Sequence, residues 1–286
     1  MVGVVIKVKE IRSGSKKLHR QLVLIKGAGD LASGVAHRLY QAGFKVVMTE
    51  QERPTVIRRP ASFAQAVFDD QVVVEGVRGC KVEQAESANI KILYDLLDQG
   101  IIPVIVDPYL QILSYLSPAV FIEGTLSKKN DRMTTPGMAP LVIALGPGFR
   151  AGRDVHAVVE TKRGHDLGRV IYNEEALPND GLPGMVGGYS LERLLKAPVS
   201  GIFRPKLSIG DVVAAGETVG YVGENPVKAN IAGVIRGLIF EGLSVKEEMK
   251  IGDIDPRAQR KYCFSISDKA RAIGGGVLEA ILACEL

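Results

Sequence analysis

The sequence predicts an α/β protein with a doubly wound, mostly parallel sheet, followed by a small all-β domain and a C-terminal helix. Two observations lead to this prediction. An apolar run at residues 22–26 stops at a glycine turn and resumes with helical periodicity, and short strands punctuated by glycine fill the last third of the chain. The chain has 286 residues, 46% of them apolar and 24% charged, so two domains are expected rather than one.

The first predicted unit is a strand at 22–26, a glycine turn and a helix that continues to residue 42. In such a unit Gly27 permits the turn, Gly29 lets the backbone approach a pyrophosphate, and Ala32 allows the helix to pack closely on the strand. The helix N-terminus faces the phosphates. The pattern is typical of a Rossmann-like sheet that binds a dinucleotide. The alternative is a Rossmann-like scaffold without a ligand.

Two acidic residues near this turn bear on its ligand. Glu50 ends the predicted strand 45–49, where a carboxylate could hold a ribose diol and favour an NAD-like over an NADP-like ribose. Asp30 places a negative charge where phosphates would lie. Its alternative role is that of a helix N-cap whose side chain accepts from the amide of Ser33 or its neighbour.

The next segments predict the rest of the sheet. A basic, proline-marked segment at 53–60 should overhang the ligand cleft, and the strand at 101–106 ends at Asp107, which is well placed for a ligand. The sequence Asp-Pro is also a simple strand stop. The other predicted elements are strands at 72–74, 119–122 and 140–145 and a helix at 87–99. Because strands alternate with helices, the sheet should be parallel, with ligands at the carboxyl ends of its strands.

A second glycine turn, at Gly146 and Gly148, leads into a segment that is dense in ionisable residues. That segment alternates like a strand, so no helix dipole supports phosphate binding at the turn. We expect Lys162, Arg163 and His165 to converge on an anion at one wall of the cleft. The alternative is an exposed strand face followed by a turn. Three residues are candidates for catalysis: His156, Lys162 and His165.

A Pro/Gly-rich stretch at 177–188 marks a domain boundary. We therefore divide the chain into a Rossmann-like nucleotide-binding domain (1–176), a β domain (190–257) and a C-terminal segment (258–286) that packs back on the first domain. The C-terminal stretch 268–286 is predicted to form a helix interrupted by Gly274-Gly275-Gly276.

Within the β domain, the sequence segments 196–203 and 228–235 look like two copies of one hairpin. The segment resembles the barrel-sandwich fold of biotinyl and lipoyl carrier domains. That resemblance implies a modified lysine on a hairpin, but Lys228 lacks the usual Met neighbours. We expect the fold without biotin or lipoate.

Composition excludes several classes of function. The formal charge of +4 is spread along the chain, and basic groups such as Arg58-Arg59 are interpreted as solvated loops, so nucleic acid is not an expected partner. Three widely spaced cysteines and four histidines without ligand spacing predict neither disulfides nor a metal site. No signal peptide or membrane span is apparent, so a cytoplasmic protein without membrane contact is expected.

Taken whole, the chain resembles the selenium-dependent molybdenum hydroxylase accessory family, and its Rossmann half is loosely similar to xanthine dehydrogenase accessory proteins. The motifs that carry this resemblance lie at 27–34, 146–165, 177–184 and 250–257. The resemblance implies maturation or cofactor delivery for a selenium-dependent molybdenum hydroxylase. The expected ligand is molybdopterin dinucleotide or an NAD(P)-like dinucleotide, and the expected partners are the hydroxylase or its cofactor-assembly proteins. The oligomeric state stays open, a homo-oligomer included.

Two other functions remain as alternatives. One is an NAD(P)-dependent oxidoreductase that acts on a small molecule, with His156 or His165 as acid/base and Lys162 polarising a carbonyl. The other is a scaffold that binds a partner protein through the β domain and leaves the glycine turn empty.

Overall fold

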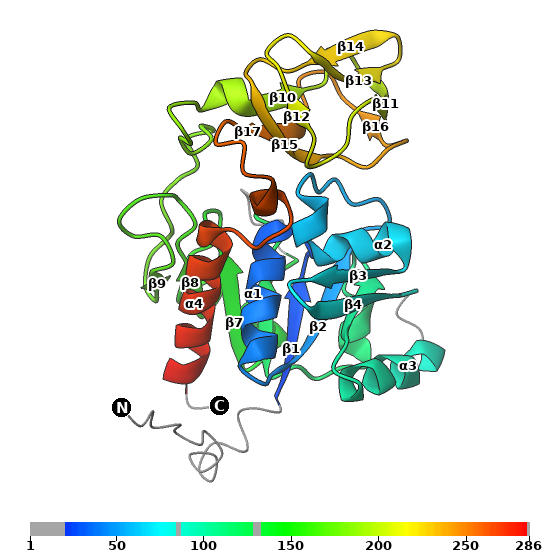
Figure 1. Cartoon of the computed structure of the whole chain (residues 1–286). Helices are drawn as coiled ribbons and strands as arrows, with labels where there is room; N and C mark the ends of the chain where they lie inside the picture. The colour runs from blue at the N-terminus through cyan, green and yellow to red at the C-terminus, as the bar shows by residue number, and fades with distance from the viewer. Residues whose placement is uncertain (1–20, 84–86, 128–132, 285–286) are drawn as a thin grey trace, which may run out of the picture.

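The computed structural model of the chain describes residues 21–83, 87–127 and 133–284. It contains a large, mostly parallel sheet with helices, and above it a smaller all-β unit made of two antiparallel sheets (Figure 1). The N-terminal segment, in which no signal peptide was apparent, lies outside the described residues. No helix in the described part of the chain is both long and apolar enough to cross a membrane.

The large sheet has nine strands in the order β3-β4-β5-β2-β1-β6-β7-β8-β9. Its interior pairs, from β4 to β8, are parallel, and the outer pairs β3/β4 and β8/β9 are antiparallel. The strands are β1 (Leu22–Lys26), β2 (Lys45–Glu50), β3 (Gln71–Val74), β4 (Val77–Val82), β5 (Ile102–Val106), β6 (Val120–Glu123), β7 (Leu141–Leu145), β8 (Ala157–Val159) and β9 (Val170–Ile171).

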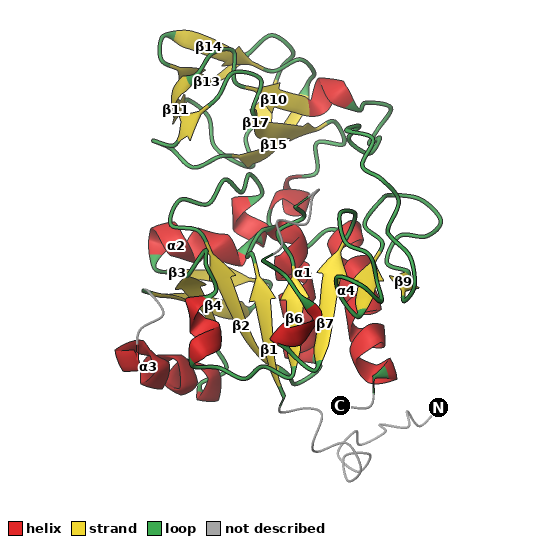
Figure 2. Ribbon diagram, turned by 180° about the vertical axis from the view of Figure 1, so that it is seen from behind, coloured by secondary structure: helices red, strands yellow, loops and turns green. Residues whose placement is uncertain are grey.

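Helices cover both faces of this sheet but unequally (Figures 1 and 2). On one face, α1 (Asp30–Gln41) and α4 (Asp268–Ala283) lie side by side, and their apolar residues share a core with Val23 and Ile25 of β1. On the other face, apolar residues of α3 (Ser87–Asp98) share a core with Leu24, which points the opposite way because side chains alternate along a strand. The short helix α2 (Ala66–Asp69) precedes β3.

The predicted strand, glycine turn and helix are present as β1 and α1, and so are most of the predicted strands. The expected fold class, a doubly wound Rossmann-like sheet with a biotinyl- or lipoyl-like barrel sandwich, is nevertheless wrong. The fold is mixed α/β. In the described residues, no α-helix crosses between β6 and β7 or between β7 and β8, and antiparallel strands form both edges of the sheet. The sequence lacks helical periodicity in these connections, and α4 from the far end of the chain covers that part of the sheet instead.

The smaller unit is built from two four-stranded antiparallel sheets, with strand orders β10-β17-β15-β12 and β14-β13-β11-β16. Apolar residues of both sheets, among them Phe203 and Ile235, form one core between them. The strands are β10 (Leu194–Lys196), β11 (Gly201–Pro205), β12 (Val212–Val213), β13 (Thr218–Val222), β14 (Asn225–Lys228), β15 (Gly233–Leu238), β16 (Ser244–Val245) and β17 (Lys250–Asp255). The domain boundaries given above remain our proposal for how the chain divides.

The C-terminal helix is continuous, so the predicted interruption at its three glycines is wrong. The helix begins at the N-cap Ser267, whose hydroxyl accepts from the amide of Ala270 at 3.2 Å. Glycines then allow α4 to lie directly on α1: a Cβ at Gly34 would stand 2.6 Å from the Cβ of Ala270, and one at Gly274 would stand 3.1 Å from the carbonyl oxygen of Gly34. Because these glycines have no side chains, the backbones of α1 and α4 approach each other closely.

The loop after β2 joins the two units. The amide of Leu238 in β15 donates to the carbonyl of Ile57 at 2.9 Å, and the Nε of Arg59 donates to the carbonyl of Leu238 at 2.8 Å. Nearby, the rings of Phe68 and Phe240 stack with their centroids 3.9 Å apart. These contacts fix the loop against the β unit.

Lys228 is expected to stay unmodified. It lies at the end of β14, four residues beyond the two-residue turn between β13 and β14, whereas a carrier lysine has to protrude from a hairpin. Intact-mass measurement of the protein from its native host tests this. A mass increase that maps to Lys228 would contradict it.

Candidate anion-binding cleft

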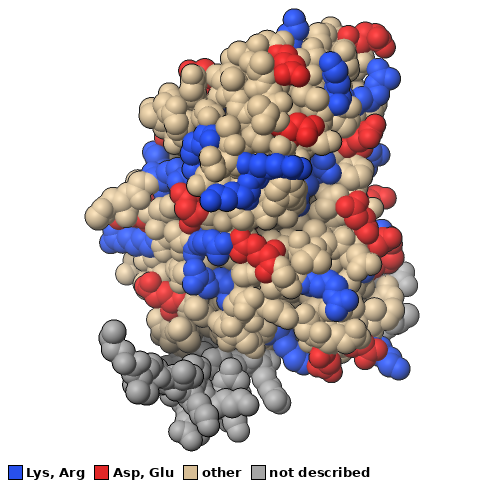
Figure 3. Space-filling model, viewed as in Figure 1, with Lys and Arg blue, Asp and Glu red and all other residues tan. Residues whose placement is uncertain are grey.

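A polar cleft lies between the large sheet and the β unit. Its volume is about 540 Å³, and its opening lies in a region where Lys and Arg side chains gather across the middle of the molecule (Figure 3). The lining combines segments far apart in the chain: the start of α1, the loop after β2, the loops at 161–163 and 177–184, strands β15 and β17, and the start of α4. Its ionisable members are Asp30, Arg58, Lys162, Arg163, Asp180, Arg193, Arg236, Lys250, Asp253 and Lys269.

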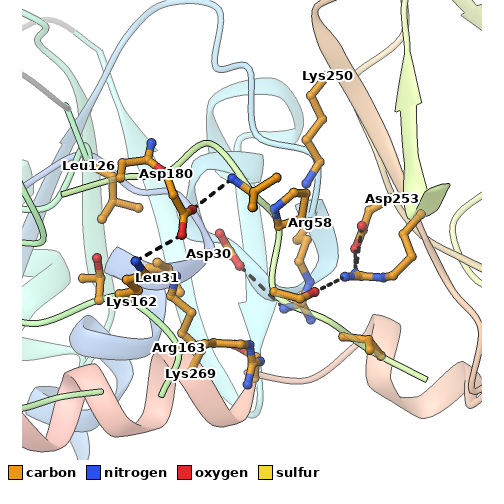
Figure 4. A pocket seen from close by; sticks show the side chains of 18 of the residues that line it. Asp30, Leu31, Arg58, Leu126, Lys162, Arg163, Asp180, Lys250, Asp253 and Lys269 are labelled. Carbon is orange, nitrogen blue, oxygen red and sulfur yellow. Dashed lines mark hydrogen bonds and ion pairs between the residues drawn. The ribbon is translucent and has the colours of Figure 1, made fainter. Parts of the chain in front are cut away.

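Arg58 lies near the centre of this cleft (Figure 4). It comes from the loop after β2 and is only 8% exposed. One terminal nitrogen donates to the carbonyl oxygens of Tyr262 and Ser265 at 3.1 and 3.2 Å, and the other lies 3.5 Å from a carboxylate oxygen of Asp30. Its Nε is buried and has no hydrogen-bond partner among the described residues.

Arg236 reaches the same cleft from β15 of the other unit. It is 7% exposed, and one terminal nitrogen lies 3.2 Å from the carboxylate of Asp255. Burial lowers the pKa of this guanidinium, and the positive charge of Arg58 lowers it further. Its Nε is also buried without a partner in the described part of the chain. Two buried guanidinium groups with the same unmet donor therefore line one cavity.

The other cations on the wall are mostly neutralised by carboxylates. Lys162 lies 3.1 Å from Asp180, and Arg163 donates two bonds of 2.7 Å to Asp268. Arg193 is buried and donates from one nitrogen to both carboxylate oxygens of Asp253 at 2.9 Å. These pairs shape the cleft, but less of their charge is open to a ligand.

A second cavity of about 420 Å³ surrounds the glycine turn. It shares Asp30, Leu31 and Leu126 with the basic cleft, so the two cavities adjoin. Six residues predicted from the sequence to bind a cofactor do line this cavity together: Gly27, Gly29, Asp30, Ala32, Glu50 and Asp107.

The carboxylates of the second cavity are already engaged by the backbone. Glu50 accepts from the amides of Ala28 and Gln51 at 2.9 and 2.8 Å, and burial raises its pKa despite these bonds. Asp107 is 3% exposed and accepts from two amides at the start of the 3₁₀-helix Gln111–Ser114. Both residues hold the loops at the carboxyl edge of the sheet.

Asp30 is not the predicted N-cap. It is the first residue of α1, Gly29 is the cap, and no side chain caps this end. The carboxylate of Asp30 points toward Arg58 instead (Figure 4). A negative charge therefore stands at the helix end where a pyrophosphate was expected, and like charges repel there.

The residues of the predicted segment 146–165 lie in different places in the structure. Lys162 and Arg163 line the basic cleft, but His165 is exposed and lines neither cavity. His156 accepts at Nδ1 from the amide of Val142 in β7 at 2.9 Å, directly before the start of β8, and lines neither cavity. Gly146 and Gly148 flank Pro147, which itself contributes to the cleft wall.

The strand predicted after this glycine turn begins only at Ala157. The residues before it form a turn that is closed by a bond of 2.9 Å from the amide of Arg150 to the carboxylate of Asp154.

Sequence reasoning missed the main cations of the cleft. Arg58 was interpreted as part of a solvated loop, yet it is buried. Arg236 and Lys269 were not singled out at all. The available signal was an arginine inside the buried run Gly233–Leu238, since an apolar strand rarely holds an unpaired charge.

No family model matches the chain. The chain is 50% identical over 262 residues to an uncharacterized protein, YqeB, of Escherichia coli strain K12; the match covers 92% of this chain and 47% of that protein. The chain thus spans about half the length of this curated relative.

Solved structures give distant likenesses only. One is a succinylglutamate desuccinylase/aspartoacylase from Rhodobacter sphaeroides, 14% identical, with a TM-score of 0.27 and coverage of 82% of this chain and 85% of that one. Another is the product-bound ectoine utilization protein EutE (DoeB) from Ruegeria pomeroyi, 12% identical, with a TM-score of 0.25 and coverage of 82% and 85%. At such TM-scores these likenesses carry no argument about fold or activity.

The expected membership in the selenium-dependent molybdenum hydroxylase accessory family is corrected. No family model supports it, and the curated relative is named only as uncharacterized. The inferred roles in molybdenum hydroxylase maturation and in NAD(P)-dependent oxidoreduction are corrected with it, as are the NAD(P) and molybdopterin dinucleotide cofactors. The carboxylate of Asp30 at the glycine turn gives a physical reason against a pyrophosphate there.

The donor set of the site does not fit a metal ion either. Within residues 21–83, 87–127 and 133–284, no group of three or more His, Cys, Asp or Glu side chains could hold one.

Proposed function

We propose that the cleft between the two units binds a small anionic molecule that carries a phosphate or carboxylate group. Arg58 and Arg236 are its main contacts. One observation carries the proposal: two guanidinium groups, 8% and 7% exposed and contributed by different units, line the same cavity, and each has a buried Nε without a partner among the described residues.

Electrostatics favours an anion at this place. Buried charges are costly unless they are paired, and two like charges that face each other raise the cost. Asp30 and Asp255 offset part of it, at 3.5 and 3.2 Å, but they leave both Nε donors unused. Phosphate and carboxylate oxygens match guanidinium donors in geometry and charge.

The cleft is also preorganised. The loop that carries Arg58 is tied to β15 by the bond from Leu238 to Ile57, and β15 carries Arg236. The two guanidinium groups are therefore held relative to each other before any ligand arrives. Preorganisation reduces the ordering cost of binding. The volume of about 540 Å³ suits a small molecule.

Calorimetric titration with inorganic phosphate, and separately with citrate as a carboxylate probe, tests the proposal. We expect saturable binding by at least one probe, and binding should weaken with added salt because the contact is electrostatic. Absence of saturable binding by either probe at low salt would refute the proposal.

Asp30→Asn is expected to strengthen phosphate binding. Its carboxylate competes with the ligand for Arg58, and the pair is partly exposed, so its removal should raise affinity by about two- to fivefold. The matched control is Asp98→Asn, which removes the same charge from an exposed pair with Lys45. Equal affinities in both variants and the wild type would show that Asp30 does not compete.

A further inference from the structure

Lys269 differs from the other cations of the basic cleft. It lies in the first turn of α4, directly after the N-cap region, and its side chain lines the cleft between Arg163 and the start of α1 (Figure 4). It is partly buried, whereas Lys250 on the opposite wall is exposed. Its amine forms no hydrogen bond or ion pair within the described part of the chain, while Lys162 on the same wall pairs with Asp180.

The surroundings of Lys269 disfavour its charged form. Burial lowers the pKa of the amine, and the nearby guanidinium of Arg163 lowers it as well, whereas Asp30, Glu160 and Asp268 raise it. The net direction is downward. The amino end of α4, where Lys269 stands, also carries a partial positive charge. A lysine that is desolvated beside cationic groups is a typical amine nucleophile.

We propose that the amine of Lys269 reacts with a carbonyl compound that also carries an anionic group, which Arg58 and Arg236 hold. This inference rests on the proposed anion site and names its substrate class. The anionic group places the carbonyl carbon in the cleft beside the amine, and orientation of this kind accelerates addition.

The step balances without any other reactant. The Nζ lone pair of Lys269 attacks the carbonyl carbon and forms a C–N bond. The amine gives up its protons, the carbonyl oxygen leaves as water, and the product is an imine. Nothing is oxidised or reduced in this step.

Reductive trapping tests the proposal in the full chain. The protein is incubated at neutral pH with sodium cyanoborohydride and either pyruvate or acetone, which differ by the carboxylate, and labelled lysines are mapped by peptide mass spectrometry. The rate at Lys269 is divided by the rate at Lys250, an exposed lysine of the same cleft. We expect this ratio to be about tenfold to a hundredfold higher for pyruvate than for acetone, the fold change that one charge-assisted hydrogen bond provides.

Two variants separate this inference from the proposed function. Arg236→Gln should slow labelling of Lys269 by pyruvate more than labelling by acetone, and Lys269→Arg, which keeps the positive charge, should abolish the label at this position. If phosphate binds and Lys269 is labelled no faster than Lys250, the amine is not a nucleophile and only this inference fails. If neither phosphate nor citrate binds and the pyruvate preference is absent, the anion site itself is wrong.

Discussion

Arg236→Gln should reduce phosphate affinity by about tenfold to a hundredfold. The substitution removes a charge-assisted hydrogen bond worth about 1.5–3 kcal/mol and half of the buried guanidinium pair. Glutamine retains much of the length of the side chain and leaves a polar group in the cleft. Calorimetry with inorganic phosphate at low salt measures the loss.

The fold should tolerate this substitution. Asp255, the carboxylate that Arg236 faces, also accepts two bonds from Arg257, so it stays paired in the variant. In the wild type the charge of Arg58 lowers the pKa of Arg236, so the two guanidinium groups repel each other. The substitution removes this repulsion. We therefore expect a thermal midpoint close to that of the wild type.

The matched control is Arg153→Gln. It removes the same charge from an exposed arginine that pairs with Asp154, outside the cleft. Phosphate affinity should not change in this variant. An equal loss in both variants would mean that binding responds to net charge alone, and an unchanged affinity in Arg236→Gln would remove the main support for the site.

The sequence predicted well those parts of the fold that local pattern determines. The strand and helix around Gly27 follow from an apolar run and helical periodicity on either side of a turn, and both are present. Glu50 and Asp107 were placed at the carboxyl edge of the sheet because parallel strands end there together, and the two residues line one cavity. Glu50 was placed by its position about twenty residues beyond the glycine turn, and Asp107 by its position at the end of a predicted parallel strand.

The predicted fold class was wrong because the connections around β7 carry no helical periodicity in the sequence. The sheet continues through β7 and β8 without crossover helices, and the face left open is covered by α4, more than a hundred residues away in sequence. The arginines of the cleft were not predicted because local sequence patterns do not indicate their contact either. Arg58 and Arg236 are 178 positions apart, and tertiary contacts such as that of Ile57 with Leu238 bring them together. The periodicity of apolar residues in a sequence predicts local helices and strands, and it does not predict contacts between residues so far apart in the chain.

Adjacent glycines in α4 should respond to alanine with opposite signs. A Cβ at Gly275 would meet nothing within 4 Å, so Gly275→Ala only gains helix propensity and should stabilise the protein by about 0.5–1 kcal/mol. A Cβ at Gly276 would overlap the carbonyl oxygen of Gly168. Because the amide of Gly168 is held by the carbonyl of Glu160 at 2.9 Å, that loop cannot easily move away.

Gly276→Ala should therefore destabilise the protein by about 1–3 kcal/mol, since overpacking against fixed backbone outweighs the same gain in propensity. Thermal unfolding followed by circular dichroism measures both variants, with the expected midpoints on either side of the wild-type value. The two variants have the same substitution in the same helix, so a difference between their stabilities must come from the surroundings of each new Cβ. If Gly276→Ala proved as stable as Gly275→Ala, α4 would not lie against the Gly168 loop.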